Sequence, residues 1–156
     1  MDENLINKIK NYLKTPFDEE LNLLGKPASD QEIIKAEKEL NVKFNSDFKQ
    51  FIKIFGGTSI GVDIYAFNNN EMMSNDTVID LTKSFRVDYE EDYRSSIVNN
   101  SYVFSMDDMG NPIMINDEDK IIIFYHDSDE YEILTDSFSK FVDWMIEGKS
   151  IYDFNE

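Results

Sequence analysis

The sequence predicts an α+β fold, with helices first, a mostly antiparallel sheet next and a helix at the end. Three observations predict it. Apolar residues recur with the 3.6-residue period of helices up to residue 55, and from residue 58 they alternate with the two-residue period of strands. The strands of the second half are separated by short acidic turns, which favours an antiparallel meander over alternating strand–helix–strand units.

Three helices are expected in the N-terminal third of the chain. Residues 4–13 carry a helical apolar stripe, and residues 15–29 read as a connector. Ser29 and Glu32 have the spacing of a capping box, so a helix should begin there and run to residue 40. A third helix is expected from a cap at Ser46 to Gly56, because glycine readily ends a helix.

The strands are expected from residue 58 onward. Residues 58–67 alternate between apolar and polar positions as a half-buried strand would, and residues 78–85 suggest a short helix. Four short strands should follow, and we expect them to form one sheet with residues 58–67. A closing helix is expected over about residues 138–147, capped by Asp136 or Ser137 and stopped at Gly148. The four strand segments are residues 101–106, 112–116, 120–126 and 131–135.

Length and charge limit the classes of function. A chain of 156 residues without internal repeats is expected to form one domain over residues 1–156. Its net charge is −17, and most of it lies in the middle. Residues 57–139 hold 18 acidic and four basic residues, net −14, whereas residues 1–56 hold ten and nine, net −1.

This acidic surface selects among partners. Nucleic acids and anionic membranes are negatively charged and are bound through Lys and Arg, so this surface repels them. It attracts a basic protein. Simple solubility is the alternative explanation of the charge. The first residues show no apolar signal segment, no apolar run reaches the roughly 20 residues of a membrane span, and cysteine is absent. We therefore expect a cytoplasmic protein that binds another protein.

The only histidine, His126, stands next to Asp127 and invites a catalytic interpretation. A hydrolytic triad also needs a nucleophile, and the chain has no cysteine and no G-x-S-x-G segment. Neighbouring strand residues point to opposite faces, so Asp127 is poorly placed to orient His126. We expect no enzymatic activity and no cofactor.

The acidic turns also invite a metal-binding interpretation. A calcium-binding loop that starts at Asp127 would need glycine at its sixth position, where Glu132 stands. Zinc would find one histidine and no thiolate. We expect no metal site, with weak Ca²⁺ binding by clustered carboxylates as an alternative.

Residues 27–146 resemble the SUKH superfamily, in its Smi/Knr-like group. Members open with a Ser-x-x-Glu-Ile helix, continue with a second helix that ends at Gly-Gly, and carry a Ser-Phe-x-x-Phe final helix. Here Asn45, Phe48 and Phe55 stand where members usually have proline, tyrosine and asparagine. The matching positions are Ser29, Glu32, Ile33, Glu37, Leu40, Asn41, Phe44, Asp47, Lys49, Gly56, Gly57, Asp107 to Asn111, residues 124–127, Ser137, Phe138 and Phe141.

The resemblance implies a curved antiparallel sheet flanked by N-terminal helices and a C-terminal helix. It also implies a non-enzymatic immunity protein that binds and neutralises a cognate polymorphic toxin. A basic nuclease-type toxin would suit the acidic surface. The alternative is an interaction scaffold or regulator of the kind found among fungal members.

The partner-binding site is expected where two acidic turns meet. Alternate turns of an antiparallel meander lie at the same end of the sheet, so the turns 107–111 and 127–130 should cluster and the turn 117–119 should lie at the other end. Five like charges without a base among them destabilise the fold, which a binding role would explain. The expected partner-binding residues are Asp107, Asp108, Asp127, Asp129 and Glu130.

Overall fold

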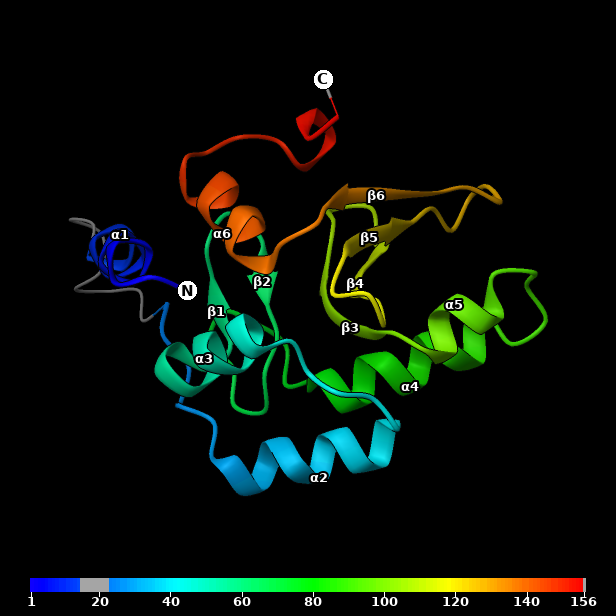
Figure 1. The fold of residues 1–156 in the computed structure, drawn as a ribbon, viewed down its shortest axis with the longest axis horizontal. Coiled ribbons are helices and arrows are strands. Elements are labelled where there is room, and N and C mark those ends of the chain that lie inside the picture. The colour runs from blue at the N-terminus through cyan, green and yellow to red at the C-terminus, as the bar shows by residue number, and fades with distance from the viewer. Residues whose placement is uncertain (15–22, 156) are drawn as a thin grey trace.

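The computed structural model describes residues 1–14 and 23–155, so residues 15–22 of the expected connector lie outside it. In this part of the chain three helices come first, two further helices separate a first pair of strands from the four later strands, and a helix and a short 3₁₀ helix follow (Figure 1). The helices are α1 (Glu3–Leu13), α2 (Asp30–Leu40), α3 (Ser46–Phe55), α4 (Val78–Asp88), α5 (Ser95–Asn99), α6 (Phe138–Ile146) and the 3₁₀ helix η1 (Ile151–Asp153). The strands are β1 (Thr58–Ser59), β2 (Asp63–Ile64), β3 (Tyr102–Met106), β4 (Pro112–Ile115), β5 (Ile121–Phe124) and β6 (Tyr131–Thr135).

The main sheet has four strands in the order β3-β4-β5-β6, and each neighbouring pair is antiparallel. Bulges shift the register between β3 and β4 and between β5 and β6, and such bulges bend a sheet. The bend is visible in Figure 1. The α+β class and the curved antiparallel sheet with flanking helices are therefore confirmed.

Helices cover both faces of this sheet. On one face, Phe104 of β3 contacts Phe138 and Phe141 of α6, with ring centroids 5.6 and 5.4 Å apart. On the other face, α4 packs against β3, and Tyr89 at its C-terminal end meets Phe124 of β5 at 5.6 Å. Helix α1 packs against α6, so helices from the two ends of the chain lie side by side (Figure 1). The sheet is thereby held between two apolar layers.

The expected strand over residues 58–67 is wrong. The segment forms a separate hairpin of two-residue strands, β1 and β2. Gly61 adopts a φ of +95° in the turn between them, a conformation that ends an extended segment. The hairpin still reaches the main sheet, because Tyr65 N–H donates to Phe104 O at 2.8 Å and Ser105 Oγ donates to Asp63 O at 2.7 Å.

The helix caps agree with the sequence in part. The capping box of Ser29 and Glu32 is confirmed, and so is the end of α3 at Gly56, whose φ is +65°. The cap at Ser46 is wrong by one position. Asn45 caps α3 instead, because its Oδ1 accepts from two backbone N–H groups of the first turn. Ser137, the second of the two expected candidates, caps α6.

The short helix α5 was not expected from the sequence. It has five residues and buries only Val98, so it carries no apolar stripe long enough to show the helical period. The segment between α4 and α5 nevertheless shapes the site described next.

Candidate partner-binding site

The two acidic turns lie at the same end of the main sheet, as predicted from the antiparallel order. Asn111 joins them directly. Its Oδ1 accepts from the backbone N–H of His126 at 2.9 Å and lies 2.6 Å from the ring Nδ1 of His126. Its Nδ2 donates to Asp107 Oδ2 at 2.8 Å. A chain of hydrogen bonds therefore runs from the β3–β4 turn to the β5–β6 turn.

Asp107 builds the first of these turns. Its Oδ1 accepts from the backbone N–H groups of Met109 and Asn111 at 3.0 and 2.8 Å. Its Oδ2 accepts from Asn111 Nδ2 and from the hydroxyl of Tyr152, each at 2.8 Å. Burial raises the pKa of Asp107, but these hydrogen bonds outweigh it and hold the pKa below its usual value. The carboxylate of Asp107 is thus largely engaged in hydrogen bonds within the fold.

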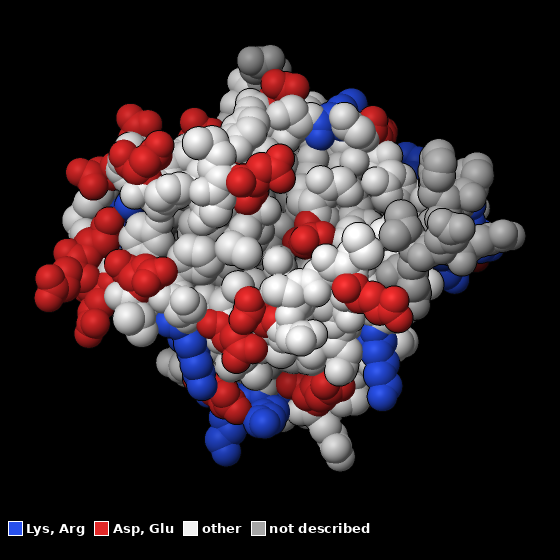
Figure 2. All heavy atoms as spheres, turned by 180° about the vertical axis from the view of Figure 1, so that it is seen from behind, with Lys and Arg blue, Asp and Glu red and all other residues white. Residues whose placement is uncertain are grey.

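The other four expected residues, Asp108, Asp127, Asp129 and Glu130, are exposed. Figure 2 shows acidic side chains gathered on its left. The β5–β6 turn and the α4–α5 connection lie on the right in Figure 1 and therefore on the left in Figure 2, which is turned by 180°. The α4–α5 connection adds three exposed acids to this side, Asp88 at the end of α4 and then Glu90 and Glu91. The structure therefore extends the acidic surface beyond the two turns.

The five expected acids have no base among them, but Arg94 is buried beneath the second turn with an exposed fraction of 1%. Its guanidinium holds Asp92 through two hydrogen bonds of 2.9 Å. It also donates to the backbone carbonyls of Tyr125 at 3.2 Å and Glu130 at 2.6 Å. The hydrogen bonds to Arg94 hold the pKa of Asp92 below its usual value.

Aromatic rings enclose the same guanidinium. The rings of Tyr89 and Phe124 lie 5.0 Å from Arg94 Cζ, within the range of a cation–π interaction. Sequence reasoning missed this residue because an Asp-x-Arg triplet in a charged segment looks like solvated surface. Only the fold brings the two rings and two carbonyls around it.

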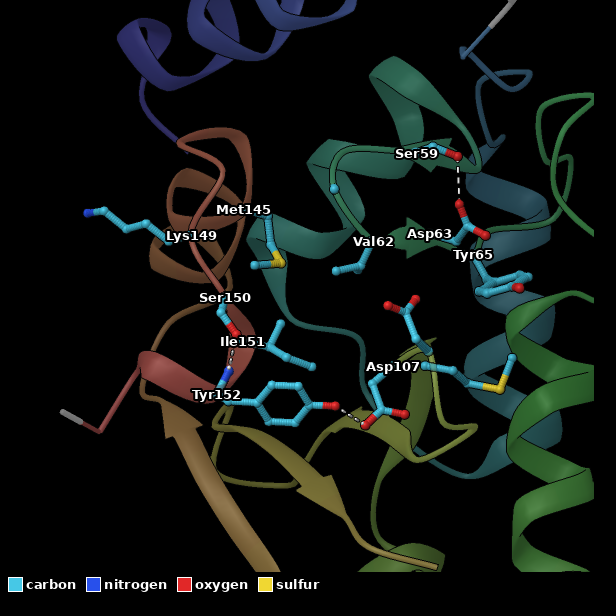
Figure 3. Close-up of a pocket in the computed structure, with 13 residues that line it drawn as sticks. Ser59, Val62, Asp63, Tyr65, Asp107, Met145, Lys149, Ser150, Ile151 and Tyr152 are labelled. Atoms are coloured by element: carbon cyan, nitrogen blue, oxygen red, sulfur yellow. Dashed lines mark hydrogen bonds between the residues drawn. The ribbon is translucent and has the colours of Figure 1, made fainter.

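A cavity of about 490 Å³ opens beside the first turn (Figure 3). Three carboxylates line it, from Asp63, Asp107 and Asp108. Lys149 also lines it, but its side chain points away in Figure 3 and its Nζ pairs with Glu147 at 2.5 Å. The cavity therefore presents negative charge to any group that enters it. The rest of its lining combines Ser59, Gly61 and Ser150 with six apolar or aromatic side chains. These six are Val62, Tyr65, Met106, Met145, Ile151 and Tyr152.

Tyr152 closes one side of this cavity and points across it toward Asp107 (Figure 3). Burial raises its pKa to about 12, and the neighbouring carboxylate adds to the effect. Tyr152 is therefore a neutral hydrogen-bond donor at physiological pH. An acidic cavity with aromatic walls has the chemistry to accept a Lys or Arg side chain. Asp63 and Tyr152 carried no motif in the sequence that pointed to this place.

His126 is paired with Asn111 and not with Asp127. The Nδ2 of Asn111 faces a carboxylate, which fixes the amide so that Oδ1 accepts from His126. The ring Nδ1 therefore carries the proton. Within residues 1–14 and 23–155, no group of three or more His, Cys, Asp or Glu side chains is placed to hold a metal ion.

The fold and the site define a class: an α+β domain in which two hydrogen-bonded acidic turns form one end of a four-stranded meander. The chain belongs to the SMI1/KNR4 family (SUKH-1), whose family model matches residues 27–144. The resemblance expected over residues 27–146 is thereby confirmed, and the family includes immunity proteins. A search of curated proteins found no match. No helix in the described part of the chain combines the length and apolarity needed to cross a membrane.

Proposed function

We propose that this protein is a non-enzymatic immunity protein that binds and neutralises a cognate polymorphic toxin in the cytoplasm, and that the toxin is of the basic nuclease type. Membership of a family that includes immunity proteins supports the class. The observation that carries the proposal is the hydrogen-bonded union of the two acidic turns through Asn111. We also propose that residues 1–156 form a single domain, because the buried core extends from Leu5 to Ile151.

Each proposed partner-binding residue has a stated task. Asp108, Asp127, Asp129 and Glu130 are exposed and meet Lys and Arg side chains of the toxin. Asp107 holds the first turn in place and contributes to the acidic wall of the neighbouring cavity. Nucleases use Lys and Arg to hold phosphates. Acids that form ion pairs with those Lys and Arg side chains therefore block access of the nucleic acid.

The acids are held in position before binding. Arg94 is bonded to the backbone of the second turn, and Asn111 fixes the first turn to it. A surface that is already ordered loses less conformational entropy on association. Exposed acids on such a surface also raise the rate of encounter with a basic protein, by about 10- to 1,000-fold at low salt.

The test is protection of cells that express the toxin encoded by the gene adjacent to this one. The variant set neutralises the four exposed acids, with Asp108→Asn, Asp127→Asn, Asp129→Asn and Glu130→Gln, and leaves Asp107 intact. The control set neutralises four exposed acids outside the two turns, with Glu3→Gln, Asp30→Asn, Glu71→Gln and Asp119→Asn. Both sets remove four negative charges, so they separate the place of the charge from its amount.

We expect the natural chain and the control set to protect cells and the turn set to fail. Equal protection by both sets would show that these turns do not dock the toxin. If the natural chain itself gives no protection, the immunity proposal is wrong and the alternative of an interaction scaffold stands.

A further inference from the structure

The edge strand β6 carries an apolar surface that no described helix covers. Tyr131 and Ile133 are 42% and 46% exposed, and as alternate residues of one strand they share a face. Their partners on β5 are Phe124 and Ile122, both buried. The same face of the sheet is thus covered over β5 and open over β6.

The cover ends because the α4–α5 segment does not extend across the whole sheet. Tyr89 and Arg94 lie over Phe124, and beyond them the helices leave a cavity of about 290 Å³. Ile97 of α5, Ile122 of β5 and the exposed pair Tyr131 and Ile133 supply its apolar lining. One water occupies roughly 30 Å³ of liquid, so the cavity has the volume of about ten waters. This space suits one or two large side chains.

Polar residues border this apolar floor, and two of them are acids. Asp117 and Glu118 of the β4–β5 turn line the cavity, and Lys120, which also lines it, is paired with Glu118 at 2.8 Å. Glu130 and Glu132 alternate with Tyr131 along the chain, so they lie on the opposite face of the sheet and do not line the cavity. An apolar centre with a charged rim is the usual anatomy of a protein interface.

The backbone edge of β6 is partly blocked. The hydroxyl of Tyr93 donates to the carbonyl of Asp129, and Asn155 Nδ2 donates to the carbonyl of Ile133 at 3.3 Å. Asp129 lies in the turn before β6, so within the strand one side chain, that of Asn155, occupies an acceptor that an added strand would use. The geometry favours insertion of a side chain into the cavity over addition of a strand to the edge.

We propose that this cavity binds one large apolar side chain of the partner, from a segment in which Lys or Arg residues flank that side chain. The proposal rests on the proposed function, because the same basic toxin would supply the segment. Asp117 and Glu118 at the rim, together with the net charge of −17, favour the flanking Lys or Arg residues, and the apolar floor selects the central residue. A second copy of this chain fits poorly, because its net charge of −17 would bring the acidic rims of two copies together.

The test uses the purified chain and two synthetic peptides, Lys-Lys-Leu-Lys-Lys and Lys-Lys-Ser-Lys-Lys, each acetylated and amidated. Backbone amide NMR shifts are followed during titration with each peptide. We expect the leucine peptide to shift the amides of Ile97, Ile122, Tyr131 and Ile133, and the serine peptide to leave them nearly unchanged. The two peptides carry the same charge, so the difference reports the apolar side chain alone.

Two variants locate the effect. Ile133→Thr keeps a β-branched side chain but removes apolar surface from the cavity, and we expect about tenfold weaker binding of the leucine peptide. Val87→Thr is the control, because Val87 is 69% exposed at the end of α4 and does not line the cavity. It should bind like the natural chain. Amide spectra of both variants report whether the fold is kept.

Three results would overturn the proposal. The two peptides shift the same amides equally, or Ile133→Thr binds the leucine peptide as well as Val87→Thr does, or these amides shift with protein concentration alone, which would assign the face to self-association. None of these results bears on cell protection by the four exposed acids, so a failure here is distinct from a failure of the proposed function.

Discussion

Replacement of Arg94 by alanine should be among the most damaging single changes in this protein. The side chain makes four hydrogen bonds, two to Asp92 and one each to the carbonyls of Tyr125 and Glu130. The variant leaves Asp92 without its cation and both carbonyls without this donor. It also opens a hole between two aromatic rings, because the guanidinium is 1% exposed.

The cost follows from these losses. The side chain of Asp92 is 19% exposed and can be rehydrated, so most of the cost comes from the two carbonyls. Each carbonyl loses a hydrogen bond to a charged donor, worth about 1.5–3 kcal/mol, so the two together cost about 3–5 kcal/mol. For a chain of this length, 1 kcal/mol shifts the melting temperature by about 2–4 °C, so the expected loss is about 6–20 °C. The second acidic turn should also loosen, because its backbone loses the donor that holds it.

Urea denaturation followed by circular dichroism measures the change in the free energy of unfolding. Arg86→Ala is the matched control, because Arg86 is half-buried on the neighbouring helix and donates one hydrogen bond, to Ser101 O at 3.0 Å. We expect the control to cost about 1–2 kcal/mol. A loss in Arg94→Ala no larger than that of the control would refute the structural role assigned to Arg94.

Three further predictions follow from the same structure. Asp107→Asn should lower the free energy of unfolding by about 1–3 kcal/mol, because an amide cannot accept all four hydrogen bonds, whereas the exposed Asp108→Asn should change it by less than about 0.5 kcal/mol. Since the folded pKa of Asp107 is depressed, its contribution is present above its unfolded pKa near 4 and is lost as pH falls through the folded value, so an acid titration should separate the natural chain from the variant. Gly57→Ala should prevent stable folding, because the added Cβ would lie 2.0 Å from Asn69 Oδ1 and 2.6 Å from Asn69 Cα. Gly110→Ala has open space around the added Cβ and should cost only about 1–2 kcal/mol for its φ of +82°. Thermal melts compare the two variants. His126→Gln should leave toxin protection unchanged and alter stability by no more than about 1–2 kcal/mol, and a turnover in the natural chain that disappears in this folded variant would contradict the non-enzymatic assignment.

The sequence predicted those elements whose signal is local. The capping box of Ser29 and Glu32 depends on two side chains and the backbone between them, so its spacing is sufficient to find it. Predicting that the two acidic turns cluster required only the rule that alternate turns of an antiparallel meander lie at the same end of the sheet. The alternation over residues 58–67 misled because it did not account for Gly61, whose left-handed φ divides the segment into a hairpin.

The site required contacts between distant parts of the chain. Arg94 is defined by rings and carbonyls from three other segments, including Glu130, 36 residues later. Tyr152 reaches Asp107 across 45 residues, which turns an expected surface acid into a residue that holds a turn. No period or short motif encodes such contacts, because they arise only when the helices and strands have packed.

The central claim is that the exposed acids of the two turns dock a basic toxin. Stopped-flow association of the purified toxin from the adjacent gene, at low and at high salt, tests it most directly. The account predicts an association rate that falls at least tenfold between about 20 mM and 500 mM salt for the natural chain, and a slow, nearly salt-independent rate for the set Asp108→Asn, Asp127→Asn, Asp129→Asn and Glu130→Gln. Equal rates for the natural chain and this set at both salt concentrations would contradict it.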